Sequence, residues 1–230
     1  MIMKISEDTL SILNNFSSIQ GSIVVEPGSV ISTIAAGKNI LAKATVDETF
    51  PKNFGIYELG QFLSAVSLLE EPSFDFSDDF VDVNSGKQNI RYGYTDPTLI
   101  PSPPATGVTL PQVDLSFVLT NDNLKAIKKA AGVLGLPHVS IESSAESLVA
   151  CVSDKSKGKS SNSFDVSLDT ESGKNSVTDF CSTFIVDNLK MFPGDYDVKI
   201  AGQGIAQFSH KELDLEYWIS SESQYSTISD

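Results

Sequence analysis

The chain has 230 residues, 40% of them hydrophobic and 20% charged, and its formal net charge at pH 7 is −14. This composition is typical of a folded globular protein and not of an intrinsically disordered one. The acidic balance argues against a protein that wraps nucleic acid over its whole surface, because counterion release requires many basic side chains. No apolar run approaches the roughly 20 residues of a membrane span, and the first residues lack the apolar core of a signal peptide, so a cytosolic setting is expected.

The first half of the chain predicts two helices among strands. A helix is expected to begin at Ser6, whose hydroxyl can cap it, with acidic residues in the first turn and apolar residues at helical spacing behind them. A second, amphipathic helix is expected over residues 57–69. The acidic run over residues 74–86 is interpreted as a solvated edge strand, because its spacing does not fit a calcium loop. Strands are expected over residues 22–25, 39–45 and 80–83.

Five prolines between residues 97 and 111 mark a change of composition near the middle of the chain. Proline fixes φ and removes a backbone donor, so this segment is expected to be an extended connector. We therefore expect an N-terminal domain over residues 1–96, a proline-rich connector over residues 97–112 and a C-terminal domain over residues 113–230.

The second half repeats the pattern of the first. Thr120 is expected to cap a helix whose apolar residues recur at steps of three and four. A shorter helix is expected around residues 186–192, ended by Pro193 and Gly194. The predicted fold class is α+β, with two similar halves that each pack two helices on antiparallel sheet. Strands are expected over residues 139–142, 147–152, 163–168, 196–201 and 213–219.

Positive charge gathers on the helix predicted after Thr120. Lys125, Lys128 and Lys129 fall within about 100° of arc, opposite the apolar stripe. No acidic residue stands four positions before or after Lys128 or Lys129, so their charge is not compensated along the helix. One interpretation is a solvated helix face. The other is a local positive face that tolerates a polyanion on one side of an acidic protein, and the acidic surroundings favour it.

Patterns that would carry catalysis or cofactor binding are weak. The run Gly158-Lys159-Ser160 is similar to the end of a phosphate-binding loop, but Ser153 stands where that loop needs glycine. No arrangement of nucleophile and base, no paired carboxylates and no metal-ligand spacing stands out, so no catalytic residue, cofactor or metal is expected. Cys151 and Cys181 are expected to be free thiols.

The chain resembles the sliding clamps of T-even-type bacteriophages, which are polymerase processivity factors. The segments that carry the resemblance are MKISEDTLSILNNFSSI from Met3, IYELGQFLSAVSLL from Ile56 and NLKMFPGDY from Asn188. The proline-rich connector and the helix after Thr120 match in position. The resemblance implies two similar DNA-clamp domains in each subunit and three subunits assembled head to tail into a ring. Helices would line its hole, and duplex DNA would pass through it.

The resemblance also implies roles for particular residues. The expected DNA-facing residues are Lys125, Lys128, Lys129, Lys190 and Lys4. The first helix departs from the family pattern, because Glu7, Asn14 and Asn15 occupy faces where clamps often place lysine. The lysines of the loop over residues 153–161 either reach DNA at the rim or are simply solvated. The strands expected at the subunit interface are residues 76–84 and 164–171.

Partners follow from the same resemblance. Besides duplex DNA, they are the replicative DNA polymerase, a clamp-loader ATPase and late transcription factors, all in the cytoplasm of the infected bacterial host. Such partners dock through short apolar peptides. The expected pocket residues are Leu99, Ile100, Leu110, Tyr217 and Trp218; alternatively, these side chains pack the sheet. The rival interpretation of the whole chain is an acidic, β-rich phage structural protein without a role on DNA.

Overall fold

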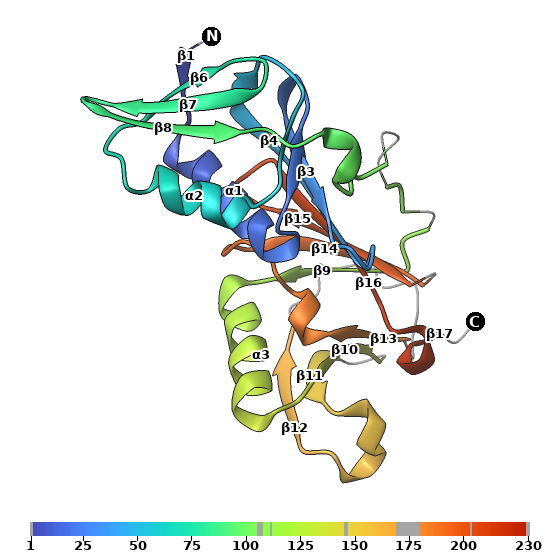
Figure 1. Cartoon of the computed structure of the whole chain (residues 1–230). Coiled ribbons are helices and arrows are strands. Elements are labelled where there is room, and N and C mark those ends of the chain that lie inside the picture. The colour runs from blue at the N-terminus through green and yellow to red at the C-terminus, as the bar shows by residue number, and fades with distance from the viewer. Residues whose placement is uncertain are drawn as a thin grey trace. The chain divides into compact units, whose positions relative to one another are not determined.

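A computed structural model describes residues 2–104, 108–110, 112–144, 147–168, 180–202 and 204–228 (Figure 1). The chain divides into two compact units, Met1–Gly107 and Val108–Asp230. Each unit combines antiparallel strands with α-helix, so the predicted α+β class is confirmed. Within the described residues, no helix is both long and apolar enough to cross a membrane.

The strands of the first unit form two antiparallel groups, in the orders β5-β2-β3-β4 and β1-β6-β7-β8. From Ala42 onward, residues of β4 alternate between buried and exposed, which gives that strand one face toward the core. The strand bounds are β1 Ile2–Lys4, β2 Ile23–Val25, β3 Gly28–Ile34, β4 Ile40–Phe50, β5 Phe54–Ile56, β6 Ser73–Phe76, β7 Phe80–Ser85 and β8 Gln88–Gly93.

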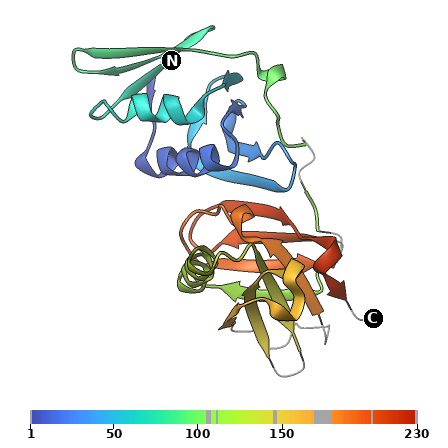
Figure 2. The ribbon, with the colours of Figure 1, turned by 60° about the horizontal axis from the view of Figure 1, so that its bottom comes forward.

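Two helices of the first unit, α1 (Glu7–Ile19) and α2 (Leu59–Val66), pack side by side (Figures 1 and 2). The predicted start of α1 is confirmed, because the Ser6 hydroxyl accepts a hydrogen bond from the Thr9 N–H at 3.2 Å. The second helix is shorter than predicted from residues 57–69. It begins at Leu59 without a side-chain cap, since Glu58 makes no capping hydrogen bond.

The prediction that residues 76–84 form an edge strand is wrong. This stretch covers the end of β6 and most of β7, and both strands are paired on either side. The edges of this sheet are β1 and β8, and Gln88, Asn89 and Arg91 of β8 are exposed. The start of the connector docks on the same unit, because Ile100 is buried beside Gly55.

The strands of the second unit run in the orders β16-β15-β14-β9 and β12-β11-β10-β13-β17. The predicted edge strand over residues 164–171 corresponds to β12, which does occupy an edge; residues 169–171 lie outside the described part of the chain. The bounds are β9 Leu115–Leu119, β10 His138–Ser143, β11 Leu148–Ser153, β12 Ser163–Ser167, β13 Phe180–Ile185, β14 Tyr196–Ala201, β15 Ile205–His210, β16 Leu215–Ser220 and β17 Thr227–Ile228.

The second unit has one α-helix in its described residues, α3 (Asn121–Leu134). Thr120 caps it as predicted, and Gly135 ends it in the left-handed conformation at φ 64°. The predicted helix around residues 186–192 is wrong. Only a single 3-10 turn forms there, η3 (Val186–Asn188). The Val186 N–H bonds to the Pro137 carbonyl at 2.9 Å, and residues 189–192 beyond η3 form neither helix nor strand.

Candidate nucleic-acid interface

The basic residues of α3 occupy the side of the helix that faces away from the core. Leu124, Ile127 and Ala131 are buried beneath the helix, whereas Lys125 and Lys129 are exposed and Lys128 is half-buried. No carboxylate among the described residues lies within ion-pair distance of Lys125, Lys128 or Lys129. The charge predicted from the sequence therefore stays uncompensated in three dimensions.

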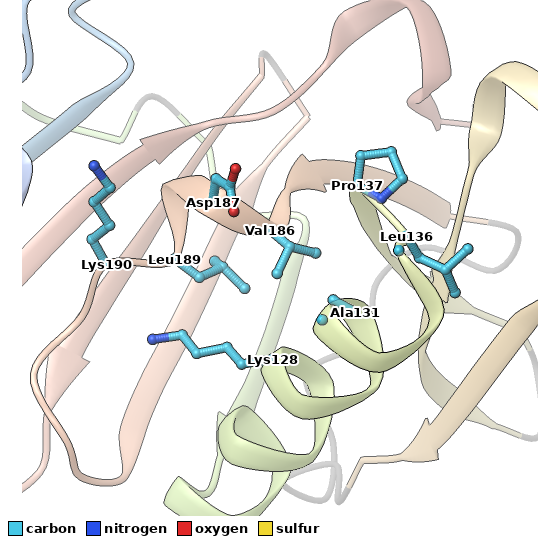
Figure 3. Close-up of a pocket in the computed structure, with 10 residues that line it drawn as sticks. Lys128, Ala131, Leu136, Pro137, Val186, Asp187, Leu189 and Lys190 are labelled. Atoms are coloured by element: carbon cyan, nitrogen blue, oxygen red, sulfur yellow. The ribbon is translucent and has the colours of Figure 1, made fainter.

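A groove of about 670 Å³ runs beside the C-terminal half of α3 (Figure 3). Its apolar lining comes from α3, from the turn after it and from the η3 segment. Lys128 and Lys190 extend toward the same side of the groove, and Asp187 also borders it. The lining residues are Lys128, Ala131, Gly132, Gly135, Leu136, Pro137, Val186, Asp187, Leu189 and Lys190.

Burial affects the pKa of Lys128. Desolvation of its ammonium lowers the pKa of Lys128 from the ordinary value. A phosphate placed at the rim of the groove would supply the opposite charge that favours the protonated form. Lys128 is thus suited to a bound anion, because its side chain borders the apolar groove and extends to the same side as Lys190 (Figure 3).

The remaining predicted lysines sit in different surroundings. Lys4 lies on β1 and not on a helix, and its Nζ is 3.1 Å from a carboxylate oxygen of Glu71. In the loop over residues 153–161, Lys155 pairs with Glu142 at 3.0 Å and Lys157 with Asp154 at 3.1 Å. Lys4, Lys155 and Lys157 thus form ion pairs with acidic residues of their own unit. This local pairing makes them weaker candidates for contacts with DNA.

The helices of the first unit carry no lysine or arginine. The exposed side of α1 presents Glu7 and Asp8 in its first turn, with Ser11 and Asn14 behind them. The exposed side of α2 is neutral and includes Gln61. Among the α-helices of the described residues, positive charge is therefore confined to α3.

The residues predicted for a partner pocket have unequal exposure. Leu99, in the 3-10 turn η1 (Pro97–Leu99), is 70% exposed, whereas Ile100 is buried within the first unit. In the second unit Leu110 is partly exposed and Trp218 is buried. Tyr217 is wholly buried, and its hydroxyl accepts a hydrogen bond from the Phe192 N–H at 3.1 Å. For Ile100, Tyr217 and Trp218, packing in the interior describes the structure better than an open pocket.

No clear centre for catalysis or metal binding emerges from the described residues. None of their histidine, cysteine, aspartate and glutamate side chains form a group of three or more that could hold a metal ion. Cys151 and Cys181 are free thiols. Burial raises the pKa of Cys151 to about 11, so this thiol is protonated at neutral pH and is a poor nucleophile.

Comparison with known proteins gives one consistent result. The family model for the DNA polymerase processivity factor matches residues 6–78, and the model for the gp45 sliding clamp, C terminal, matches residues 116–223. The chain is 31% identical over 225 residues to the sliding clamp of Vibrio phage KVP40, covering 96% of this chain and 99% of that relative. It is 26% identical over 214 residues to the sliding clamp of Escherichia phage RB69, covering 88% and 89% of the two chains.

The fold has solved counterparts at much lower identity. A structure of A. fulgidus PCNA superposes with a TM-score of 0.70 at 16% identity, covering 96% of this chain and 97% of the other. The matching family models place the chain in the class of DNA-clamp proteins. The chain belongs to the sliding-clamp family of DNA polymerase processivity factors, as the KVP40 relative and the family models show.

Proposed function

We propose that this chain forms a closed ring of three subunits that encircles duplex DNA and tethers the replicative DNA polymerase for processive synthesis. The observation that carries the proposal is the uncompensated basic side of α3 on a chain with a net charge of −14. In this proposal Lys125, Lys128, Lys129 and Lys190 face the DNA. Lys4 is the weakest candidate, since Glu71 already pairs with it.

A ring held by topology needs only weak contacts that do not depend on sequence. Lysines that meet phosphate oxygens provide such contacts, because phosphates carry no sequence information. The acidic residues elsewhere repel DNA from the outer surface and favour the hole. Because α1 and α2 carry no lysine or arginine, we assign most of the proposed contact to the second unit of each subunit.

The proposed ring closes through the two edge strands β8 and β12. Among the described residues each has one neighbour in its own sheet, so in this part of the chain each leaves a row of backbone groups available for another strand. Phe164 of β12 is 38% exposed and so offers a large apolar side chain at that edge. A contact between two different edges repeats from subunit to subunit and closes when the rotation suits.

Partner proteins are proposed to dock outside the ring. Leu99 offers an exposed apolar side chain on a turn in which the Asp96 carboxylate accepts a hydrogen bond from the Thr98 N–H at 2.9 Å. The solved PCNA relative has the C-terminal region of FEN-1 bound to it, which supports peptide docking in this fold. The proposed partners of this chain are the polymerase, a clamp-loader ATPase and late transcription factors, in the cytoplasm of the infected bacterial host.

The test is charge reversal on α3 with a matched control. The variant Lys125→Glu, Lys129→Glu is compared with Lys43→Glu, Lys199→Glu, which makes the same charge change at exposed strand positions. Each phosphate contact contributes about 0.9 to the slope of log affinity against log salt. Removing two phosphate contacts from each of three subunits lowers that slope by at most about five.

Retention on nicked circular DNA after loading, measured at several salt concentrations, gives the answer. The α3 variant is expected to leave the DNA at least tenfold faster than the parent, while sedimentation shows an unchanged oligomer. The strand variant is expected to behave like the parent. Equal retention of the parent and the α3 variant would show that α3 does not face the DNA.

A further inference from the structure

The chain that follows Lys190 is fixed by two buried tyrosines. Tyr196 donates its hydroxyl to the Phe192 carbonyl at 2.5 Å, and the Phe192 N–H donates to the Tyr217 hydroxyl at 3.1 Å. Both tyrosines are wholly buried, and their rings meet edge to face with centroids 6.1 Å apart. The backbone at Phe192 is therefore held on both its N–H and its C=O.

His210 holds the next residue. Its Nδ1 accepts hydrogen bonds from the N–H groups of Glu212 and Leu213, both at 3.1 Å, which places the ring proton on Nε2. Nε2 then donates to the Pro193 carbonyl at 3.2 Å. Gly194 is required here twice over, since its φ is 153° and a Cβ would stand 2.0 Å from the imidazole.

Asp195 completes the connection. One of its carboxylate oxygens accepts a hydrogen bond at 2.7 Å from the N–H of Asn121, the first residue of α3. Its backbone carbonyl accepts from the Lys211 N–H at 2.9 Å. The carboxylate also suits the positive end of the helix dipole. One short segment thus carries Lys190 at one end and the start of α3 at the other.

We propose that Asp195 and His210 are positioning residues that align Lys190 with the basic side of α3. Through them, Lys128 and Lys190 are held on the same side of the groove (Figure 3). Because the backbone that carries each lysine is already ordered, only the side chains lose freedom when they meet neighbouring phosphates of one strand, which lowers the entropic cost of each contact. The proposal rests on the proposed function, because it takes DNA as the anion.

The arrangement also explains a sequence motif. The segment NLKMFPGDY combines the basic residue, the glycine that the imidazole requires and the carboxylate that caps α3. A segment that only closed a loop would not need a carboxylate aimed at a helix 74 residues away in the chain.

The first experiment compares Asp195→Ala with Asp195→Asn in the full-length protein. Asparagine keeps an acceptor for the Asn121 N–H, whereas alanine removes it. Asp195→Ala is expected to shorten retention on nicked circular DNA at least threefold and to lower the salt slope by about 0.9 for each phosphate interaction that it abolishes. Asp195→Asn is expected to stay within twofold of the parent. In the protein without DNA, hydrogen exchange in the first turn of α3 should quicken for Asp195→Ala only.

The second comparison is His210→Ala with His210→Gln, since the glutamine amide can still donate to the Pro193 carbonyl. Glutamine is expected to restore at least half of the retention that alanine removes. The control is Thr183→Val, which removes the buried hydroxyl bonded to the Tyr225 carbonyl at 2.9 Å, also in the second unit but outside the interface. It lowers stability and is expected to leave retention unchanged.

The outcomes separate this inference from the function on which it rests. If Asp195→Ala keeps parental retention and salt slope while Lys125→Glu, Lys129→Glu loses them, Asp195 does not position the interface and the inference falls alone. It falls likewise if Thr183→Val loses as much retention as Asp195→Ala at equal thermal stability. If the α3 variant itself retains DNA normally, both proposals fall together. Should His210→Ala not fold, the Asp195 pair still decides.

Discussion

Glu48 ties strand β4 to the beginning of α1. Its side chain is only 9% exposed, because it lies on the core-facing side of β4. One carboxylate oxygen accepts from the Ser6 N–H at 2.5 Å, and the other accepts from the Thr9 hydroxyl at 2.6 Å. Glu48→Ala removes both acceptors and leaves the two donors without these partners. Glu48→Gln keeps the volume and one good acceptor but loses the charge.

The size of the effect follows from these two bonds. A hydrogen bond to a charged group contributes about 1.5–3 kcal/mol net, and a buried donor left without a partner costs about 1–3 kcal/mol. We therefore expect Glu48→Ala to lower the free energy of unfolding by about 3 kcal/mol. The expected loss for Glu48→Gln is about 1.5 kcal/mol. In a domain of about 100 residues, 3 kcal/mol corresponds to a fall in Tm of more than about 10 °C.

The effect depends on pH in a defined direction. Burial raises the pKa of Glu48, but the hydrogen bonds from Thr9 and Ser6 outweigh burial and leave the pKa below its ordinary value of 4.5. A carboxylate whose pKa falls on folding stabilises the fold above its unfolded pKa and stops doing so as pH drops through the folded pKa. The difference between the parent and Glu48→Gln should therefore shrink below about pH 4.

Denaturant unfolding followed by circular dichroism at pH 7 and at pH 3.5 tests this reasoning. Subunit concentration must be the same in every experiment, because assembly adds to apparent stability. Two results would refute it: a loss under about 1 kcal/mol for Glu48→Ala at pH 7, or a Glu48→Gln deficit that does not change at the lower pH.

Three further predictions concern other parts of the molecule. Ser11→Lys with Asn14→Lys adds positive charge to α1 and should lengthen retention on circular DNA, raising the salt slope by about 0.9 for each new phosphate contact; an unchanged slope would mean that α1 does not line the hole. Phe164→Asp places a charge on the β12 edge and should dissociate the oligomer in sedimentation while circular dichroism stays native. Gly55→Ala puts a Cβ 2.5 Å from a backbone oxygen and should lower the free energy of unfolding by about 1–3 kcal/mol, whereas Gly21→Ala, with no atom within 4 Å, should not.

Local chemistry made some elements predictable. Ser6 and Thr120 start helices because the hydroxyl of each accepts a hydrogen bond from the backbone N–H three residues later. Both partners of that hydrogen bond lie within four consecutive residues, so the sequence alone indicates it. The limits of β14 agree with the predicted residues 196–201, since alternating burial imposes a period of two. The basic side of α3 could also be predicted, because the 3.6-residue period of a helix is enough to place its lysines on one side.

Elements that depend on distant partners were harder to predict. The stretch over residues 186–192 has apolar residues at helical spacing, but it is too short for that spacing to tell a helix from an extended segment with a 3-10 turn. In the sheet β1-β6-β7-β8, the strand β8 lies at an edge and residues 76–84 do not. The prediction failed because strand order follows from pairing across the sheet and not from the charge of one strand.

The candidate site divides in the same way. The positions of Lys125 and Lys129 on the exposed side of α3 follow from the sequence alone. The neutralisation of Lys4 by Glu71 does not, since 67 residues separate them. The hydrogen bond from the Asn121 N–H to Asp195 could not be predicted from the sequence either, because the pairing of β14 with β9 is what brings the carboxylate to the start of α3.

The most direct test of the central claim is to cut the DNA under a loaded clamp. Clamps are loaded onto nicked plasmid circles, free protein is removed, and the circle is then opened with a restriction enzyme. If DNA is threaded through a ring, retention should be long on the intact circle and should collapse after cutting, and bulky blocks at both ends should restore it. Retention that is the same before and after cutting would contradict the account, because it would mean that the protein grips DNA at its surface.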